Sequence, residues 1–380
     1  MKKIKPAPHH TTDHRSKLQR LRAFVNQHHL ATTVVCGIAL ILISGSITYF
    51  LLHKKPNYRN MPLSVKKQAP KKYYSPLTGL PVANQAATTQ PVTAVMIENS
   101  PSARPQSGLK KAGVVYEAVA EGGITRFLAV YQHDKPALIG PVRSLRLYYL
   151  SWGAQYQASI AHVGGSPNAL TEVRNGNYRD IDQFFNAGSY WRANDRRAPH
   201  NMYTSGERLD QLNATKGYKE SVFQSFARQD PKPVTPESTK KQTKQPATPT
   251  ANQITVNLSS NLYNTSYVYD KAANTYVRAM AGAPHTDREE GQIAPHVVVV
   301  LEAPIERRAG TADAYEDVVT TGTGKAHIFQ NGTVVEATWR KEGMSQPLTL
   351  VDAANKPIAL NRGQTWIATI TPGRGGVSWQ

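Results

Sequence analysis

A long uncharged stretch near the N-terminus is the clearest feature of the hydropathy pattern. Residues 30–52, LATTVVCGIALILISGSITYFLL, are 23 residues without a charged side chain. As a helix they span about 35 Å, which exceeds a hydrocarbon core of about 30 Å. A cleaved signal peptide usually has a shorter apolar region of about 7 to 15 residues. The pattern therefore predicts a retained transmembrane anchor, with cleavage as the alternative.

Strand-like and helix-like segments alternate between residues 73 and 227. Apolar runs typical of strands occur in VTAVMIEN, GVVYEAVAE, TRFLAVYQ and ASIAHVGG. Before the last of these, PVRSLRLYYLSWGAQYQ has apolar side chains at helical spacing, with Pro141 in its first turn. A second helix is expected to begin at Ser166. This alternation predicts an α/β or α+β domain over 73–227.

A polar segment separates this domain from the last third of the chain. Residues 228–252, RQDPKPVTPESTKKQTKQPATPTAN, contain no aromatic residue, and Val234 is their one apolar side chain larger than alanine or proline. Such a composition cannot offset chain entropy by burial, so we expect a flexible linker. From 253 to 380, short runs such as HVVVVLEA and TWIATI are separated by Asn-Gly and Gly-rich turns. We therefore expect a mostly β domain there.

Basic segments lie on both sides of the predicted anchor. Residues 1–55 hold nine Lys and Arg against one acid, and residues 53–72 form a Lys- and Pro-rich spacer. Because the two flanks carry similar numbers of positive charges, the positive-inside rule does not decide the orientation. The lone Cys36 lies in the apolar run, and the absence of later cysteines suits a domain outside the cell. We expect residues 1–29 to be a cytoplasmic tail and the bulk of the chain to be extracytoplasmic.

The net charge indicates which classes of molecule the protein is expected to bind. The formal charge is +19, and after residue 55 the chain still has 36 Lys and Arg against 25 Asp and Glu, an excess of 11. Such an excess favours anionic partners, which include nucleic acid, anionic lipid and phosphate-bearing wall polymers. We expect membrane association through the N-terminal helix, together with an anionic wall polymer or another envelope component. Nucleic acid is not an expected partner.

An arginine-rich stretch is the main candidate for a binding site. The sequence YWRANDRRAPHNMYTS, residues 190–205, interleaves three arginines and a histidine with large rings that prefer partial burial. Arginine can hold a carboxylate or phosphate by two hydrogen bonds at once. A further arginine, Arg143, is expected in the first helical turn after Pro141, where backbone N–H groups also favour an anion. The predicted ligand-binding residues are Arg143, Arg146, Arg192, Arg197, His200 and Asn201.

A structural role is the alternative for these arginines. Acids on buried strands need partners, and Glu117 or Glu121 could pair with Arg143 and Arg146. In that case the charges would stabilise the fold and bind nothing.

The sequence offers weaker candidates for catalytic residues than for binding residues. Hydrolysis of a glycan or phosphoester needs a proton donor and a base, which could come from Glu98, Glu117, Glu121, His162 and His200. No G-x-S-x-G motif occurs, and the sole cysteine lies in the predicted anchor, so serine and cysteine nucleophiles have no support. The histidines lack the spacing of a metal site, and GTGKA lacks that of a nucleotide loop. We expect no metal and no cofactor.

Long strings on both sides of the linker resemble the YerB-like family of bacterial envelope proteins, which is classified as a domain of unknown function. Before the linker, from about 75 to 204, they include SPLTGLPV, AVMIENSPSARPQSGL, VVYEAVAEGGITRFLAVY, IGPVRSLRLYYLSW, HVGGSP and RRAPHNMYTS. After it, YDKAANTYVRAMAGAPHTD, TGTGKAHIFQNG and LNRGQTWIATI resemble the family's C-terminal domain. The resemblance implies a lipid-anchored protein outside the membrane, whereas this chain has a membrane-spanning segment. It implies no catalytic residue.

Three functional hypotheses follow. The preferred one is an envelope protein that binds an anionic polymer or ligand, with Arg192, Arg197 and His200 converging with Arg143 and Arg146 on one pocket. The alternatives are a hydrolase acting on a cell-wall glycan or phosphoester, and a protein-interaction scaffold of the envelope whose charges are structural.

Overall fold

The computed structural model describes residues 14–53, 71–231, 249–307 and 316–380. The chain divides into two units, Met1–Pro70 and Lys71–Gln380, and each is described by itself. The predicted tail before residue 14 and most of the predicted spacer lie outside the described residues.

The first unit contains two helices, α1 (His14–Gln27) and α2 (His29–His53). The most apolar window of α2 has a mean hydropathy of 2.2, and among the described residues this helix alone is long and apolar enough to cross a membrane. None of its residues is buried within the protein, as suits a helix whose solvent is lipid. The helix predicted from the uncharged run at 30–52 is therefore present with nearly the same bounds.

A ten-stranded mixed sheet forms the centre of the second unit. Its strands, in order across the sheet, are β22 (Thr349–Val351), β21 (Thr333–Lys341), β20 (Gly322–Gln330), β17 (Val297–Glu302), β24 (Thr365–Ile370), β4 (Val114–Glu121), β5 (Ile124–Tyr131), β3 (Thr93–Glu98), β6 (Ser159–Ala161) and β7 (Arg179–Asp180). The parallel pair β24–β4 joins strands from opposite sides of the predicted linker. The mixed α/β region and the mostly β region therefore share one sheet and, within 71–380, one compact unit.

Different elements cover the two faces of this sheet. Along β4, Tyr116 and Ala118 belong to one apolar core and Val115 to the other, because successive side chains of a strand point to opposite faces. The first core contains side chains of α3 (Leu147–Ala154) and α4 (Pro167–Asn175). The second contains side chains of α5 (Gly206–Thr215) and of a second, antiparallel sheet.

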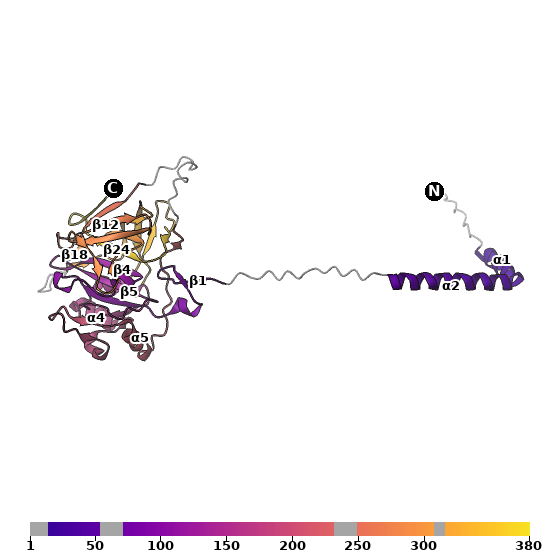
Figure 1. The fold of residues 1–380 in the computed structure, drawn as a ribbon, viewed down its shortest axis with the longest axis horizontal. Helices are drawn as coiled ribbons and strands as arrows, with labels where there is room; N and C mark the ends of the chain where they lie inside the picture. Colours follow the sequence, from indigo (N-terminus) through magenta and orange to yellow (C-terminus); the bar gives the residue numbers. More distant parts are fainter. Residues whose placement is uncertain (1–13, 54–70, 232–248, 308–315) are drawn as a thin grey trace, which may run out of the picture. The chain divides into compact units, whose positions relative to one another are not determined.

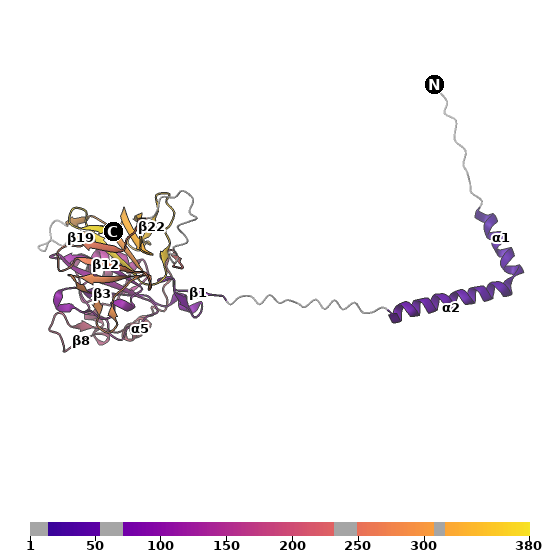
Figure 2. The ribbon, with the colours of Figure 1, turned by 45° about the horizontal axis from the view of Figure 1, so that its top comes forward.

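The second sheet has five strands, all from the region after the linker. Their order is β14 (Ala283–Pro284), β13 (Thr275–Met280), β12 (Thr265–Asp270), β11 (Gln253–Asn257) and β25 (Gly376–Trp379). Figure 1 shows α4 and α5 toward one end of the second unit and β12 toward the other, and Figure 2 shows α5 and β12 separated in the same way. The prediction of a mostly β region from 253 onward is confirmed.

Short elements complete the second unit. The small strand pairs are β1 (Tyr73–Tyr74) with β2 (Pro81–Val82), β8 (Trp191–Arg192) with β9 (Met202–Tyr203), β10 (Arg228–Gln229) with β23 (Leu360–Asn361), β15 (Thr286–Asp287) with β16 (Gly291–Gln292), and β18 (Ile305–Arg307) with β19 (Glu316–Val318). Single 3-10 turns occur at Ala86–Thr89, Pro101–Ala103, Leu109–Lys111, Gln183–Phe185 and Ala187–Ser189.

The helix expected from Pro141 begins later than predicted. α3 starts at Leu147. Arg143 instead belongs to an extended segment beside β3, where its backbone N–H donates to the Met96 carbonyl at 2.9 Å. This sheet-like hydrogen bond competes with the helical one, and local periodicity does not predict it. The expectation that Arg143 lies in a first helical turn is therefore wrong.

Both ends of the segment predicted as a linker pack against the second unit. Arg228 and Gln229 form β10, and the Arg228 guanidinium donates from Nη1 to Thr365 Oγ1 at 2.8 Å. At the other end, Ala251 is buried. Any linker is thus shorter than 228–252, and residues 232–248 lie outside the described part of the chain.

Candidate functional site

Glu98, the last residue of β3, is the centre of the candidate site. Its side chain is only 5% exposed. Glu98 Oε1 accepts a hydrogen bond from Ser100 Oγ at 2.8 Å and lies 2.8 Å from His200 Nδ1. Glu98 Oε2 lies 3.6 Å from Arg143 Nε. We call these four residues the Glu98 cluster.

Burial of the Glu98 carboxylate explains its partners. A buried carboxylate is costly unless positive charge and hydrogen-bond donors surround it, and Arg143, Ser100 and His200 supply both. When His200 Nδ1 donates to this carboxylate, the neutral ring leaves Nε2 as an acceptor. The side chains of Arg143 and His200 are 26% and 27% exposed. The cluster therefore presents one guanidinium and one imidazole to solvent.

The β8–β9 hairpin brings His200 to Glu98. Strand β9 lies beside the Arg143 segment, because Val142 N donates to the Met202 carbonyl at 2.6 Å. A contact between residues about a hundred positions apart in the chain thus arises from one hairpin and one extended segment.

Asn201 stabilises this hairpin from within. Its Oδ1 accepts from Arg192 Nη1 at 2.8 Å, and its Nδ2 donates to the Ala193 carbonyl at 2.9 Å. Because Asn201 is only 7% exposed and both ends of its amide are used, its role here is positional. Arg192 and Arg197 keep exposed side chains. Of the six predicted binding residues, those that remain accessible on adjoining segments are Arg143, Arg192, Arg197 and His200.

Arg146 does not join this group. Its Nη2 contacts Glu121 Oε2, while Arg126 contacts the other oxygen of the same carboxylate. Arg146 is 5% exposed and Arg126 is 4% exposed. Burial lowers the pKa of Arg126, and the neighbouring charge of Arg146 lowers it further. The ion pair that the sequence suggested as an alternative therefore forms for Arg146, with Glu121.

Glu117 is also a structural residue in this arrangement. Its Oε2 accepts from Arg278 Nη2 at 2.8 Å and from the Trp366 indole N–H at 3.0 Å. The side chains of Glu117 and Arg278 are 0% exposed. A carboxylate enclosed in this way cannot reach a substrate from solvent, so Glu117 is a poor catalytic candidate.

His162 is enclosed as well. Its ring is 0% exposed, with Nε2 at 3.1 Å from Asp180 Oδ1 and Nδ1 at 2.8 Å from the Gly164 carbonyl. Both ring nitrogens are therefore used inside the fold. Of the predicted acid–base residues, His200 and Glu121 keep appreciable exposure, and Glu98 acts on His200 from below the surface.

The structure brings no cluster of metal-ligating side chains together in the part of the chain that it describes. No group of three or more His, Cys, Asp and Glu side chains there could hold a metal ion. His285 is buried, and its pKa lies well below 6.5 because of burial and the charge of Arg278.

The sequence did not predict Ser100 or the partners of Glu117. Ser100 lies two residues after the end of β3, in a string that resembles the family, and this was the available signal. Arg278 is 161 residues from Glu117, and Trp366 is farther still. Pairing across such separations has no local signature. Trp366 reaches Glu117 because β24 lies beside β4, and Arg278 reaches it from β13 of the second sheet.

Comparisons with known proteins agree with this fold. Residues 77–219 match a family model described as "Protein of unknown function (DUF3048) N-terminal domain", and residues 254–367 match the corresponding C-terminal domain. Over 301 residues the chain is 34% identical to "Putative lipoprotein YerB" of Bacillus subtilis (strain 168), which covers 78% of this chain and 86% of that protein. Superposition of this chain on the crystal structure of the YerB protein from Bacillus subtilis has a TM-score of 0.69, and the two sequences are 31% identical. The match covers 81% of this chain and 100% of the YerB chain.

These matches confirm the family resemblance on both sides of the linker. The similarity extends over both sequence regions and includes the strands that carry the Glu98 cluster. The chain therefore belongs to the DUF3048 family, with the N-terminal and C-terminal domains of that family in one polypeptide.

Proposed function

We propose that this chain is a membrane-anchored envelope protein that binds an anionic envelope polymer through basic side chains around the Glu98 cluster. The apolar helix α2 supports the anchor, as does the similarity to a protein whose name describes a lipoprotein. In this proposal the membrane anchor is a spanning helix and not a lipid attached to a cysteine, because Cys36 lies within the apolar run. The folded part from residue 71 onward is placed outside the membrane.

One observation carries the binding proposal. Four basic residues that lie on adjoining segments keep exposed or partly exposed side chains, and we call them the basic rim: Arg143, Arg192, Arg197 and His200. Of the nearby carboxylates, the single charge of Glu98 is shared by the rim residues Arg143 and His200, and Asp195 lies 2.5 Å from Arg288. The rim thus retains positive charge that no described acid fully neutralises.

The buried Glu98 positions the rim and does not cancel it. It holds Arg143 from one oxygen and His200 from the other, which fixes their direction before a ligand arrives. Preorganised guanidinium groups lose less entropy on binding a phosphate or carboxylate than free side chains do. The exposed Arg192 and Arg197 would then contact further charges of a polymer.

The direct test is retention of the full chain on purified wall fractions. Membrane-reconstituted protein should be retained by an anionic polymer fraction at low salt and released as salt rises, because binding displaces counterions. A fraction stripped of its anionic polymer is the control. Equal retention on both fractions would contradict the proposal and favour a protein-interaction scaffold.

The Glu98–His200 contact favours a second candidate, hydrolysis of a wall glycan or phosphoester. A carboxylate that accepts from Nδ1 orients an imidazole as a general base through Nε2, and Arg143 could stabilise developing negative charge. Incubation of the reconstituted protein with wall polymer, followed by measurement of released sugar and phosphate, tests this candidate. Release that is lost in His200→Gln supports hydrolysis, and no release contradicts it.

A further inference from the structure

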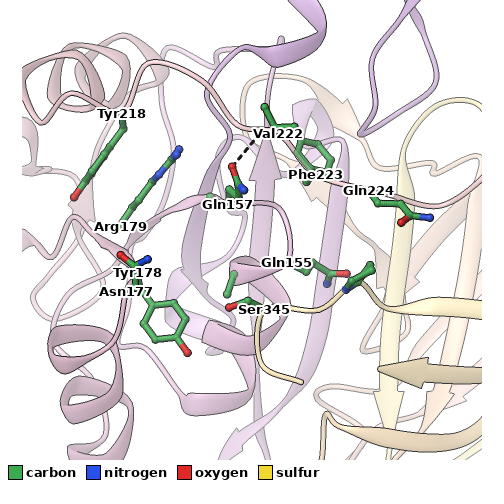
Figure 3. A pocket seen from close by; sticks show the side chains of 13 residues that line it. Gln155, Gln157, Asn177, Tyr178, Arg179, Tyr218, Val222, Phe223, Gln224 and Ser345 are labelled. Atoms are coloured by element: carbon green, nitrogen blue, oxygen red, sulfur yellow. Dashed lines mark hydrogen bonds between the residues drawn. The ribbon is translucent and has the colours of Figure 1, made fainter. Parts of the chain in front are cut away.

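The second unit contains a cavity whose lining includes no residue of the Glu98 cluster. It has a volume of about 660 Å³, within the usual range for ligand sites of about 300 to 1,000 Å³. Segments that follow α3, α4 and α5 form most of its wall, and the loop between β21 and β22 closes another side. Figure 3 shows these side chains around the cavity.

Tyr218 forms an aromatic wall of this cavity. The Arg179 guanidinium lies 5.2 Å from the centre of the Tyr218 ring, and Figure 3 shows the two side chains alongside each other. Arg179 Nη1 also donates to the Glu220 carbonyl at 2.9 Å and to Ser221 Oγ at 3.2 Å. The ring is therefore supported on one face by an arginine that protein acceptors already engage. The half-buried Tyr178 adds a second aromatic ring.

Amide side chains provide the polar part of the wall. Gln157 has φ +48°, a left-handed conformation that is uncommon for a residue other than glycine. Its Oε1 accepts from Val222 N at 3.1 Å, which leaves its amide N–H groups for a ligand. The side chains of Gln157, Asn177 and Gln224 are exposed, and Val222 is 59% exposed beside them.

The loop between β21 and β22 is fixed before any ligand binds. Lys341 is 1% exposed, and its Nζ donates to the carbonyls of Met344 and Gln346 at 2.7 Å each. Ser345 and Pro347 of the same loop line the cavity. A preformed wall lowers the entropy that binding must overcome.

The charge of this cavity differs from that of the basic rim. Arg179 is the one charged residue among those that line it, and its Nη1 and its planar face are engaged as described. An anionic ligand would find little free positive charge here. Aromatic rings pack against the C–H faces of sugars, and amides both donate to and accept from hydroxyl groups. These groups together fit a neutral carbohydrate.

The cavity also has room for more than one sugar. A neighbouring cavity of about 510 Å³ is likewise lined by Tyr218. Its wall also includes Asn213, His133, Lys219 and the ion pair of Lys135 with Asp210. The Tyr218 ring therefore lies between two adjoining hollows. This arrangement suits a ligand made of repeating units that extends across the ring.

We propose that these two hollows form one groove, the Tyr218 groove, which binds an oligosaccharide. Tyr218 packs against a sugar ring, and Gln157 and Asn177 bind hydroxyl or amide groups of the same or the next sugar. The groove is separate from the basic rim, so this proposal stands or falls independently of anion binding.

Calorimetric titration of the reconstituted full chain tests the proposal. The probe is the tetrasaccharide of β-1,4-linked N-acetylglucosamine, and the protein is held in a lipid disc because sugar-headed detergents would compete. We expect saturable binding that Tyr218→Ala weakens by about tenfold, the effect of losing one ring contact. Asn177→Ala, at an exposed turn position, should weaken it as well. Phe184→Ala removes a ring that is 67% exposed and outside the groove, and should leave binding unchanged.

Three results would overturn the proposal. They are no binding of the tetrasaccharide, binding that is equal in wild type, Tyr218→Ala and Asn177→Ala, and binding of an unglycosylated peptide of matched length in place of the sugar. Arg143→Gln should leave the sugar titration unchanged, which separates this result from any test of the basic rim.

Discussion

Glu117 of β4 and Arg278 of β13 form an ion pair of 2.8 Å in which both side chains are completely buried. Arg278 also lies over the ring of Trp366, with 4.2 Å between the guanidinium carbon and the ring centre. Glu117 belongs to the region that matches the N-terminal family domain, and Arg278 and Trp366 belong to the region that matches the C-terminal domain. The two regions therefore share charged as well as apolar interior contacts.

Removal of one member of this pair should destabilise the second unit strongly. Glu117→Ala leaves the Arg278 charge buried without its carboxylate, and we expect a loss of about 3 to 5 kcal/mol in the free energy of unfolding. Denaturant titration followed by circular dichroism measures it. The control is Asp210→Ala, which breaks the more exposed Lys135–Asp210 pair and should cost about 1 kcal/mol or less. Equal small losses in both variants would contradict a structural role for Glu117.

His285 should make stability depend on pH. Arg278 Nε donates to His285 Nδ1 at 2.8 Å, so the folded protein requires a ring that accepts at this nitrogen. Burial, aided by the charge of Arg278, holds the folded pKa well below the ordinary 6.5. Below pH 6.5 the unfolded chain therefore binds a proton that the folded chain does not, and stability falls as pH falls, by up to about 1.4 kcal/mol per pH unit.

The substitution His285→Gln should flatten this dependence. Glutamine can accept from Arg278 and donate to Gln106 without titrating, so unfolding free energies measured from pH 7 down to pH 5 should change less than in wild type. His133→Gln, at a partly buried ring, is the comparison and should change the slope less. An unchanged slope in His285→Gln would show that this histidine is not the source.

The sequence predicted those features that depend on neighbouring residues. The uncharged run at 30–52 gave α2, and the apolar runs gave β3, β4 and β5, because hydropathy and periodicity act over a few residues. The predictions were wrong where segments that are distant in the chain compete for the same hydrogen-bond or ion-pair partners. Arg143 pairs with β3 instead of starting a helix, and Arg146 is held by Glu121, which lies on another element.

Contacts between distant segments also explain why the sequence predicted the candidate site only in part. Composition identified the arginines and His200 but could not assign Glu98 as the residue that holds His200 and Arg143, because no local pattern encodes that contact. The sequence likewise did not predict that the two regions share one sheet, since β24 and β4 are separated by more than two hundred residues.

Limited proteolysis tests the shortened linker. The composition of 232–248 predicts that the first cut within 71–380 falls there, and trypsin should act at Lys240, Lys241 or Lys244. Because β24 pairs with β4, the two fragments should stay together on gel filtration without denaturant. A first cut between 100 and 200, or separation of the fragments, would contradict this division of the chain.

Protease protection tests the orientation of the anchor. If residues 1–29 are cytoplasmic, protease added to intact protoplasts should remove the part from residue 53 onward and leave the N-terminal tail protected. An epitope at each end distinguishes the two products. Digestion of the folded part only after lysis would show the opposite orientation.

The basic rim can be tested most directly by comparing two double variants that remove the same charge. Arg192→Ala/Arg197→Ala removes the exposed rim arginines, and Lys325→Ala/Arg340→Ala removes two exposed charges from β20 and β21. The measurement is fluorescence anisotropy of labelled poly(glycerol phosphate) with the reconstituted full chain over a series of salt concentrations. We expect the rim variant to bind at least about tenfold more weakly and to lower the salt slope by about 2. Its melting temperature should fall only slightly, because Arg192 no longer donates to Asn201. The control variant should bind like wild type. Equal affinities and slopes for the two variants would contradict anion binding at the basic rim.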